Sequence, residues 1–298
     1  MHEHGESRLR DALLLTIIIL VIEVVVGWRA NSLALLSDAG HIVTDVFALG
    51  MAWFAQRLAH LPSDQRHTFG YQRSGILAAL INAILLVLIG LAVAVEAVSR
   101  LHHPQTVSPL PVIAAAAAAI AVNAFIALRL HQSGQDNLNI RAALLHVVGD
   151  IAASIGVVIS GLVILIWHAN LADPIISLLI AVLIGIGAWR ILRETVIILL
   201  EGTPGDVDLE KLALAMREVP GVEDVHDLHV WALSDGFRLL TAHVGVPDQS
   251  LVDAANLISD VKTLLRARFH IEHVTIELEA LNQPRSGRPI YLERDKAQ

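Results

Sequence analysis

One short pattern of a histidine and an aspartate occurs twice in this chain, each time within a long apolar stretch. His41 precedes Asp45 by four residues, and His146 precedes Asp150 by the same spacing. On a helix, residues four apart lie on one face, one turn from each other. Each copy therefore presents an imidazole and a carboxylate in the same direction. Together the copies offer two nitrogens and two oxygens, which suits tetrahedral coordination of Zn²⁺.

The apolar surroundings of both pairs favour a functional role. Ionisable side chains within a membrane span are costly and usually serve a function inside the helix bundle. The alternative is that each pair hydrogen-bonds internally and only joins helices. Two matching pairs at similar depth favour the metal site. We therefore interpret them as one site through which a divalent metal ion is transported, formed by His41, Asp45, His146 and Asp150.

Other polar side chains also fall inside apolar stretches. Asp38 lies three residues before His41; it could assist the site, line the path of the ion, or bond a neighbouring helix. Asn82, Asn123 and Glu23 favour hydrogen bonding between helices. Burial could also make Glu23 titratable.

The composition indicates a membrane protein. The 298 residues are 55% hydrophobic and only 17% charged, below the roughly 25% that is usual in soluble domains. The net charge is −8 and no basic stripe is visible, which argues against nucleic-acid binding. Cysteine is absent, so thiolate ligands and cysteine nucleophiles are excluded. The 15 histidines and the carboxylates are then the available side-chain metal ligands.

Several apolar stretches are long enough to cross a bilayer, which takes roughly 20 residues in a helix. Placing the N-terminus in the cytoplasm puts most arginines on the inner side, in agreement with the positive-inside rule. We therefore expect a membrane all-α six-helix transmembrane bundle with both termini in the cytoplasm. The expected spans are 9–28, 34–57, 75–99, 110–130, 142–167 and 174–198.

The composition changes at about residue 201. We expect a transmembrane domain over 1–200, a cytoplasmic metal-binding and dimerisation domain over 201–281, and a disordered polar tail over 282–298. The cytoplasmic part has an α-β-β-α-β order that is typical of a small α+β domain. Its expected helices and strands are 206–218, 223–233, 237–246, 250–268 and 273–279.

The cytoplasmic domain contains a second candidate metal site. His226 and His229 would lie on opposite faces of an ideal strand, so they would share a metal only if that strand were bulged. Glu277 and Glu279 share a face of the last strand. A strand histidine, His243 and a glutamate could form a regulatory site; the alternative is structural hydrogen bonding.

A third, weaker candidate lies between the second and third spans. Asp64 and His67 are close in sequence there, but two ligands seldom suffice to hold a metal ion.

Two competing functions use the same residues. An intramembrane metalloenzyme is disfavoured because the chain has no His-Glu-x-x-His and no Gly-x-Ser-x-Gly. A catalytic zinc also keeps one position open for water, whereas four convergent ligands would close the site. No residue pattern in the sequence distinguishes a transporter from a membrane metal sensor that does not transport. We therefore expect a transporter that is not an enzyme.

Four runs of this chain match known motifs: 30–41 together with Asp45, 69–73, 146–150 and 225–231. They resemble those of the cation diffusion facilitators, and the likeness extends over 9 to about 280. The similarity is strongest to the bacterial zinc/cadmium/cobalt-resistance branch, which is close to vertebrate zinc transporters.

This resemblance implies a homodimeric, proton-coupled metal exporter of the bacterial inner membrane, with a metallochaperone-like cytoplasmic domain. Zn²⁺ would be the preferred substrate, with Cd²⁺, Co²⁺ and Ni²⁺ as further candidates, and protons would be the counter-substrate. The transport site would consist of the two His-Asp pairs. The family's loop site would use Asp64 and His67, but Tyr71 occupies its last position. The family's cytoplasmic site would map onto His226, His243, Glu277 and Glu279.

Overall fold

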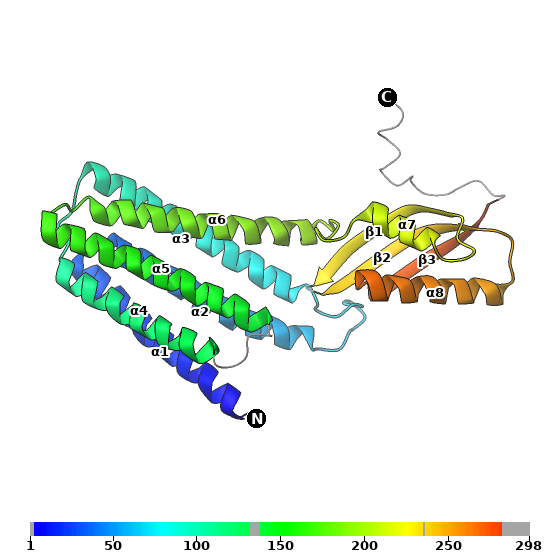
Figure 1. Cartoon of the computed structure of the whole chain (residues 1–298), viewed down its shortest axis with the longest axis horizontal. Coiled ribbons are helices and arrows are strands. Elements are labelled where there is room, and N and C mark those ends of the chain that lie inside the picture. The colour runs from blue at the N-terminus through cyan, green and yellow to red at the C-terminus, as the bar shows by residue number, and fades with distance from the viewer. Residues whose placement is uncertain (1–2, 132–137, 235, 282–298) are drawn as a thin grey trace. The chain divides into compact units, whose positions relative to one another are not determined.

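The computed structural model describes the backbone at residues 3–131, 138–234 and 236–281, and side chains at 14–128, 144, 146–234 and 236–281. The tail expected to be disordered, 282–298, lies outside the described residues. The chain forms two compact units (Figure 1). One contains the described residues of 1–54 and 78–192, and the other those of 55–77 and 193–281.

Long helices make up the N-terminal two thirds of the chain, at the positions where membrane spans were expected. In the described part, five of them, α2 to α6, are long and apolar enough to cross a membrane. α1 covers the first expected span. The bounds are α1 Glu3–Ala30, α2 Leu33–Ala59, α3 Ser74–His102, α4 Pro109–His131, α5 Leu138–Trp167 and α6 Ala172–Leu199. The fold is therefore a helical transmembrane domain, as predicted.

Small side chains allow the helices of this domain to approach closely. Ala115 and Ala116 of α4 are buried in a cluster with Leu35 of α2 and Val157 of α5. Such residues are enriched at helix contacts in membranes because they let the backbones come together. Large aliphatic side chains remain on the outer surface, for example Leu91, which is 60% exposed. This arrangement suits a bundle whose outside faces hydrocarbon.

A buried carboxylate holds the N-terminus of α2. Asp173, at the start of α6, is 0% exposed. It accepts a hydrogen bond from the Ser32 hydroxyl at 2.6 Å and one from the Leu33 amide at 2.7 Å. The first amides of a helix have no partner within the helix, and a negative charge there also suits the helix dipole. Asp173 thereby fixes the start of the helix that carries His41 and Asp45.

The C-terminal domain has the predicted α-β-β-α-β order. Its three strands lie in the order β1-β2-β3, with β1 and β2 antiparallel and β2 and β3 parallel. The parallel pair is joined through α8, as a crossover connection requires. The bounds are α7 Leu209–Arg217, β1 Asp224–Ser234, β2 Phe237–Val246, α8 Leu251–Phe269 and β3 His273–Ala280.

One face of the sheet forms the core of this domain with both helices. Met216 of α7 and Val261 of α8 are fully buried in one cluster with Leu240 and Val244 of β2. Successive side chains of a strand point to opposite faces. His243, between Ala242 and Val244, therefore lies on the face turned away from the helices, which leaves that face available for polar chemistry.

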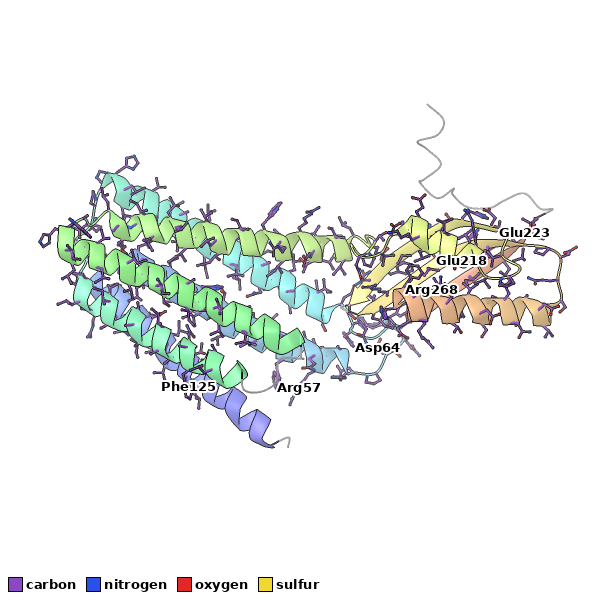
Figure 2. The ribbon with its side chains drawn as sticks, in the orientation of Figure 1. Arg57, Asp64, Phe125, Glu218, Glu223 and Arg268 are labelled. Carbon is purple, nitrogen blue, oxygen red and sulfur yellow. The ribbon has the colours of Figure 1, made fainter. Side chains whose placement is uncertain are left out.

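The connection between α2 and α3 is organised around one carboxylate, that of Asp64 (Figure 2). It accepts hydrogen bonds from the amides of Arg66 and His67 at 2.7 and 2.6 Å. It also contacts the His67 ring at 3.2 Å and the Tyr71 hydroxyl at 3.2 Å. The bonds from the His67 and Arg66 amides lower the pKa of Asp64 to about 2. The carboxylate is thus engaged in holding the loop.

The hydrogen bonds that Asp173 accepts from Ser32 and Leu33 lead to a prediction for stability. In Asp173→Ala the Ser32 hydroxyl and the Leu33 amide lose a buried acceptor. Each unpaired buried group costs on the order of 1–3 kcal/mol, so we expect a clear fall in the melting temperature of the protein in detergent. Asp173→Asn, which keeps one acceptor oxygen, should fall less. Equal melting temperatures for the native protein and Asp173→Ala would show that these hydrogen bonds do not stabilise the protein.

The loop carboxylate makes a prediction for pH dependence. The pKa of Asp64 is lower in the folded loop than its ordinary value of 3.8. The ionised carboxylate therefore stabilises the loop fully above pH 3.8, and this stabilisation is lost as the pH falls through about 2. At neutral pH, Asp64→Ala should reduce the hydrogen-exchange protection of the Arg66 and His67 amides. The difference from the native protein should shrink as the pH falls through about 2. Unchanged protection in the variant at neutral pH would refute this role.

Candidate metal sites

The transmembrane unit brings the two predicted His-Asp pairs together. His41 and Asp45 lie on α2, and His146 and Asp150 lie on α5. One ligand atom from each of the four lies within 4.8 Å of all the others. These side chains, separated by about a hundred residues in the sequence, therefore form a single cluster.

Each histidine of this cluster lies between the acids of both helices. His41 Nε2 is 3.7 Å from Asp45 and 3.8 Å from Asp150. His146 Nε2 is 3.4 Å from Asp45 and 3.8 Å from Asp150. The contacts across the helices are thus as close as those along each helix. The two pairs form one site and not two.

The spacing of these atoms suits a metal ion better than direct hydrogen bonds. Hydrogen bonds between nitrogen and oxygen are usually about 2.7–3.2 Å long, shorter than all four distances in the cluster. Zinc ligands bound at about 2.0 Å in a tetrahedron lie about 3.3 Å from each other. The observed 3.4–3.8 Å separations need little adjustment to reach that geometry.

The charge of the cluster also matches a divalent cation. Asp45 and Asp150 as carboxylates and the two histidines as neutral ligands have a total charge of −2. A bound divalent ion would neutralise this charge, which matters because an unpaired charge is costly in apolar surroundings. The His146 side chain is 49% exposed and that of Asp150 only 14%. The cluster is therefore open on the His146 side.

Asp38, for which the sequence left three roles open, bonds a neighbouring helix. It is 1% exposed, and its Oδ2 accepts a hydrogen bond from the Ser154 hydroxyl at 2.9 Å. This bond joins α2 to α5 one turn beyond the His-Asp cluster on each helix. Asp38 therefore supports the two helices that carry the four candidate ligands.

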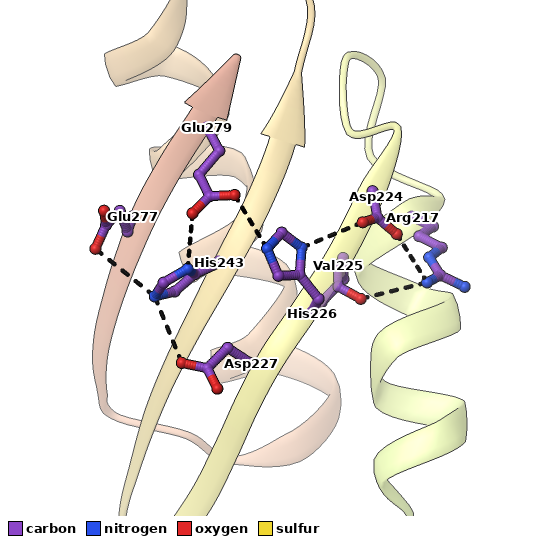
Figure 3. Close-up of polar contacts among 8 residues, drawn as sticks. All are labelled: Arg217, Asp224, Val225, His226, Asp227, His243, Glu277 and Glu279. Atoms are coloured by element: carbon purple, nitrogen blue, oxygen red, sulfur yellow. Dashed lines mark hydrogen bonds and ion pairs between the residues drawn. The ribbon is translucent and has the colours of Figure 1, made fainter. Parts of the chain in front are cut away.

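The cytoplasmic candidate residues also converge, on the face of the sheet opposite the helices. His226 of β1, His243 of β2 and Glu279 of β3 form a group with mutually close ligand atoms. Glu279 contacts His226 Nε2 at 3.0 Å and His243 Nδ1 at 2.9 Å (Figure 3). In contrast to the transmembrane cluster, these distances are those of hydrogen bonds.

Glu277, also expected in this site, lies at its edge. It is 3.7 Å from His243 Nε2, and its side chain is 65% exposed. His226 is oriented from its other side, because its Nδ1 is 3.2 Å from Asp224, which accepts a hydrogen bond from Arg217 (Figure 3). Such outer contacts fix the ring orientation and tautomer of a metal-binding histidine.

The sequence did not indicate Asp227, which the structure adds to the cytoplasmic cluster. β1 is bulged after His226: the pairing advances from His226 to His229 on β1 but only from His243 to Thr241 on β2. Asp227 in the bulge has a φ of 46°, a conformation that aspartate tolerates better than most residues. Its carboxylate lies 3.6 Å from His243, whereas His229 stays outside the cluster.

The loop residues Asp64 and His67 contact each other but gather no further ligand. Among the described residues, no third histidine, aspartate or glutamate forms a close group with them. Because the Asp64 oxygens accept bonds from two backbone amides, the geometry here is that of a structural turn.

Comparison with known families identifies both parts of the chain. The family model described as the cation efflux transmembrane domain matches residues 9–200. The model described as the cation efflux protein, cytoplasmic domain, matches residues 204–281. Together they cover the helical bundle and the α+β domain.

Curated relatives are similar over almost the whole chain. Zinc transporter ZitB of Escherichia coli is 39% identical over 279 residues, covering 93% of this chain and 88% of the relative. The metal cation efflux system protein CzcD of Cupriavidus metallidurans is 38% identical, covering 93% and 89%. The cadmium, cobalt and zinc/H(+)-K(+) antiporter of Bacillus velezensis is 35% identical, covering 93% and 91%.

These matches exclude one of the competing functions that the residues left open. The matched family and its members are metal transporters and not enzymes, so an intramembrane metalloenzyme is excluded. The chain is a member of the cation diffusion facilitator family, in its zinc/cadmium/cobalt exporter branch.

Proposed function

We propose that this protein exports Zn²⁺ from the cytoplasm in exchange for protons, by alternating access. The observation that carries the proposal is the cluster of His41, Asp45, His146 and Asp150, in which one ligand atom from each residue lies within 4.8 Å of the other three. The name of the Escherichia coli relative, a zinc transporter, and that of the Bacillus antiporter support the substrate and the exchange. Cd²⁺, Co²⁺ and Ni²⁺ are further substrates that such ligands accept.

The chemistry of the ligands couples metal to protons. Carboxylates and imidazoles bind a metal ion only after losing their protons, so metal and protons compete for the same atoms. Histidine changes its charge near physiological pH. When the cluster opens to the cytoplasm, zinc displaces protons from it. When it opens to the other side, incoming protons displace zinc, and the inward proton gradient drives export.

We further propose a homodimer in the bacterial inner membrane, with both termini in the cytoplasm. The arginine asymmetry between the expected loops supports this orientation. The match to the family's cytoplasmic domain supports the same side for residues 204–281.

The cytoplasmic cluster is proposed as a regulatory metal site. His226, His243 and Glu279 supply its ligand atoms, with Asp227 and Glu277 within 3.7 Å of His243. A metal bound there would have to replace the hydrogen bond between Glu279 and His243 Nδ1 and the close contact of Glu279 with His226 Nε2. Its occupancy would therefore respond to the concentration of metal in the cytoplasm.

Zinc uptake into proteoliposomes under an imposed pH gradient tests the transport function. Native protein should take up zinc in proportion to the gradient, and His146→Ala should lose this flux, because one of four ligands is missing. His103→Ala, at an exposed position after α3, is the matched control and should transport normally. Zinc binding without any flux by the native protein would indicate a membrane metal sensor instead.

The regulatory site is tested by Glu279→Gln in the full-length protein. We expect the variant to keep maximal flux but to lose the dependence of its activity on zinc at the cytoplasmic face. Glu218→Gln is the control, since the Glu218 carboxylate forms an exposed surface pair with Arg268 at 2.8 Å (Figure 2), and such pairs contribute little. An unchanged metal dependence in Glu279→Gln would rule out this role.

A further inference from the structure

Glu23 of α1 is a fully buried carboxyl group that the metal site does not use. It is 0% exposed, and within the described part of the chain neither of its oxygens has a hydrogen-bond partner. The residues beside it, Ile22 and Val24, are 36% and 41% exposed. Glu23 therefore faces the interior of the bundle, but the helix–helix hydrogen bond that the sequence favoured is not formed there.

The charged neighbours of Glu23 are also acids. They are Asp38 of α2 and Asp150 of α5. α4, which also packs against α1 near this level, contributes the apolar Ala119 and Val122. Asp38 is itself engaged with the Ser154 hydroxyl. Among the described side chains, the surroundings of Glu23 therefore supply repulsion from two carboxyl groups and no hydrogen-bond donor to its oxygens.

A carboxyl group in such a place has a clear energetic preference. Burying an ionised carboxylate without a partner is very costly, and the neutral acid avoids most of this cost. Asp38 and Asp150 increase the cost of ionisation, because like charges repel strongly where the effective dielectric constant is low. Glu23 is therefore held as the neutral acid while the neighbouring metal cluster contains no cation.

We propose that Glu23 carries one of the counter-transported protons, at a position separate from the four metal ligands. This inference rests on the proposed zinc/proton exchange. A divalent ion at the cluster offsets the negative charge of Asp150 and so favours the ionised form of Glu23. Its proton then passes to water on the cytoplasmic side as zinc binds. After zinc leaves on the other side, Glu23 takes up a proton from that side. Zinc and this proton thereby weaken each other's binding reciprocally.

The test is the number of protons exchanged per zinc ion. Native protein and Glu23→Gln are reconstituted in proteoliposomes with the membrane potential held at zero. The zinc accumulation ratio at steady state is then measured against the pH difference. Each coupled proton changes this ratio about tenfold per pH unit. We expect Glu23→Gln to accumulate about tenfold less zinc than native protein at one unit of pH difference.

The controls separate this inference from the proposed function. Glu96→Gln, which alters an acid paired with Arg100 at the end of α3, should accumulate zinc as the native protein does. If native protein depends on the pH difference and Glu23→Gln depends on it equally, Glu23 carries no proton and the inference is wrong. If native protein itself shows no dependence, zinc/proton exchange is wrong.

A measurement on the native protein covers the case in which Glu23→Gln does not fold. Infrared spectra of protein with labelled glutamate carboxyls are compared before and after zinc is added at neutral pH. Exposed glutamates are ionised in both states. We expect the band of one protonated glutamate, which zinc removes. Absence of this band from the metal-free protein, or its persistence with zinc bound, would overturn the inference.

Discussion

The cost of placing charged groups in an apolar bundle governs this structure. Each buried carboxyl group in the membrane unit needs hydrogen-bond donors or a nearby cation, or else it stays protonated. Asp173 finds the hydroxyl of Ser32 and the amide of Leu33, and Asp38 finds the hydroxyl of Ser154. Asp45 and Asp150 lie 3.4–3.8 Å from the nitrogens of His41 and His146, farther than usual hydrogen bonds, which is why the cluster they form suits a divalent ion.

The two acids that accept hydrogen bonds hold in place the helices that carry the His-Asp cluster. Asp173 fixes the start of α2, and Asp38 joins α2 to α5 beside the metal cluster. Both helices that carry ligands are therefore held by buried hydrogen bonds close to the site. A transporter must hold its metal ligands accurately, and it must also expose them first to one side of the membrane and then to the other. Movement of these helices as a supported pair would meet both requirements.

The two candidate metal sites differ in a way that suits their proposed roles. The histidine nitrogens of the transmembrane cluster lie 3.4–3.8 Å from the aspartate oxygens, so a cation would enter without breaking strong bonds. In the cytoplasmic cluster Glu279 contacts both histidines at 2.9 and 3.0 Å. A metal would have to compete with these contacts. The first arrangement suits a site that is filled in every cycle, and the second a site that responds to concentration.

Sequence periodicity by itself determined the helices, the α-β-β-α-β domain and the faces that carry each His-Asp pair. A spacing of four fixes which side chains share a helix face, and this is a local property. Long-range packing decided the rest. The contact of His41 with Asp150, the bulge that turns Asp227 toward His243, and the missing donor at Glu23 all depend on neighbours distant in sequence. Local patterns set where a side chain points, but only tertiary structure decides what it meets.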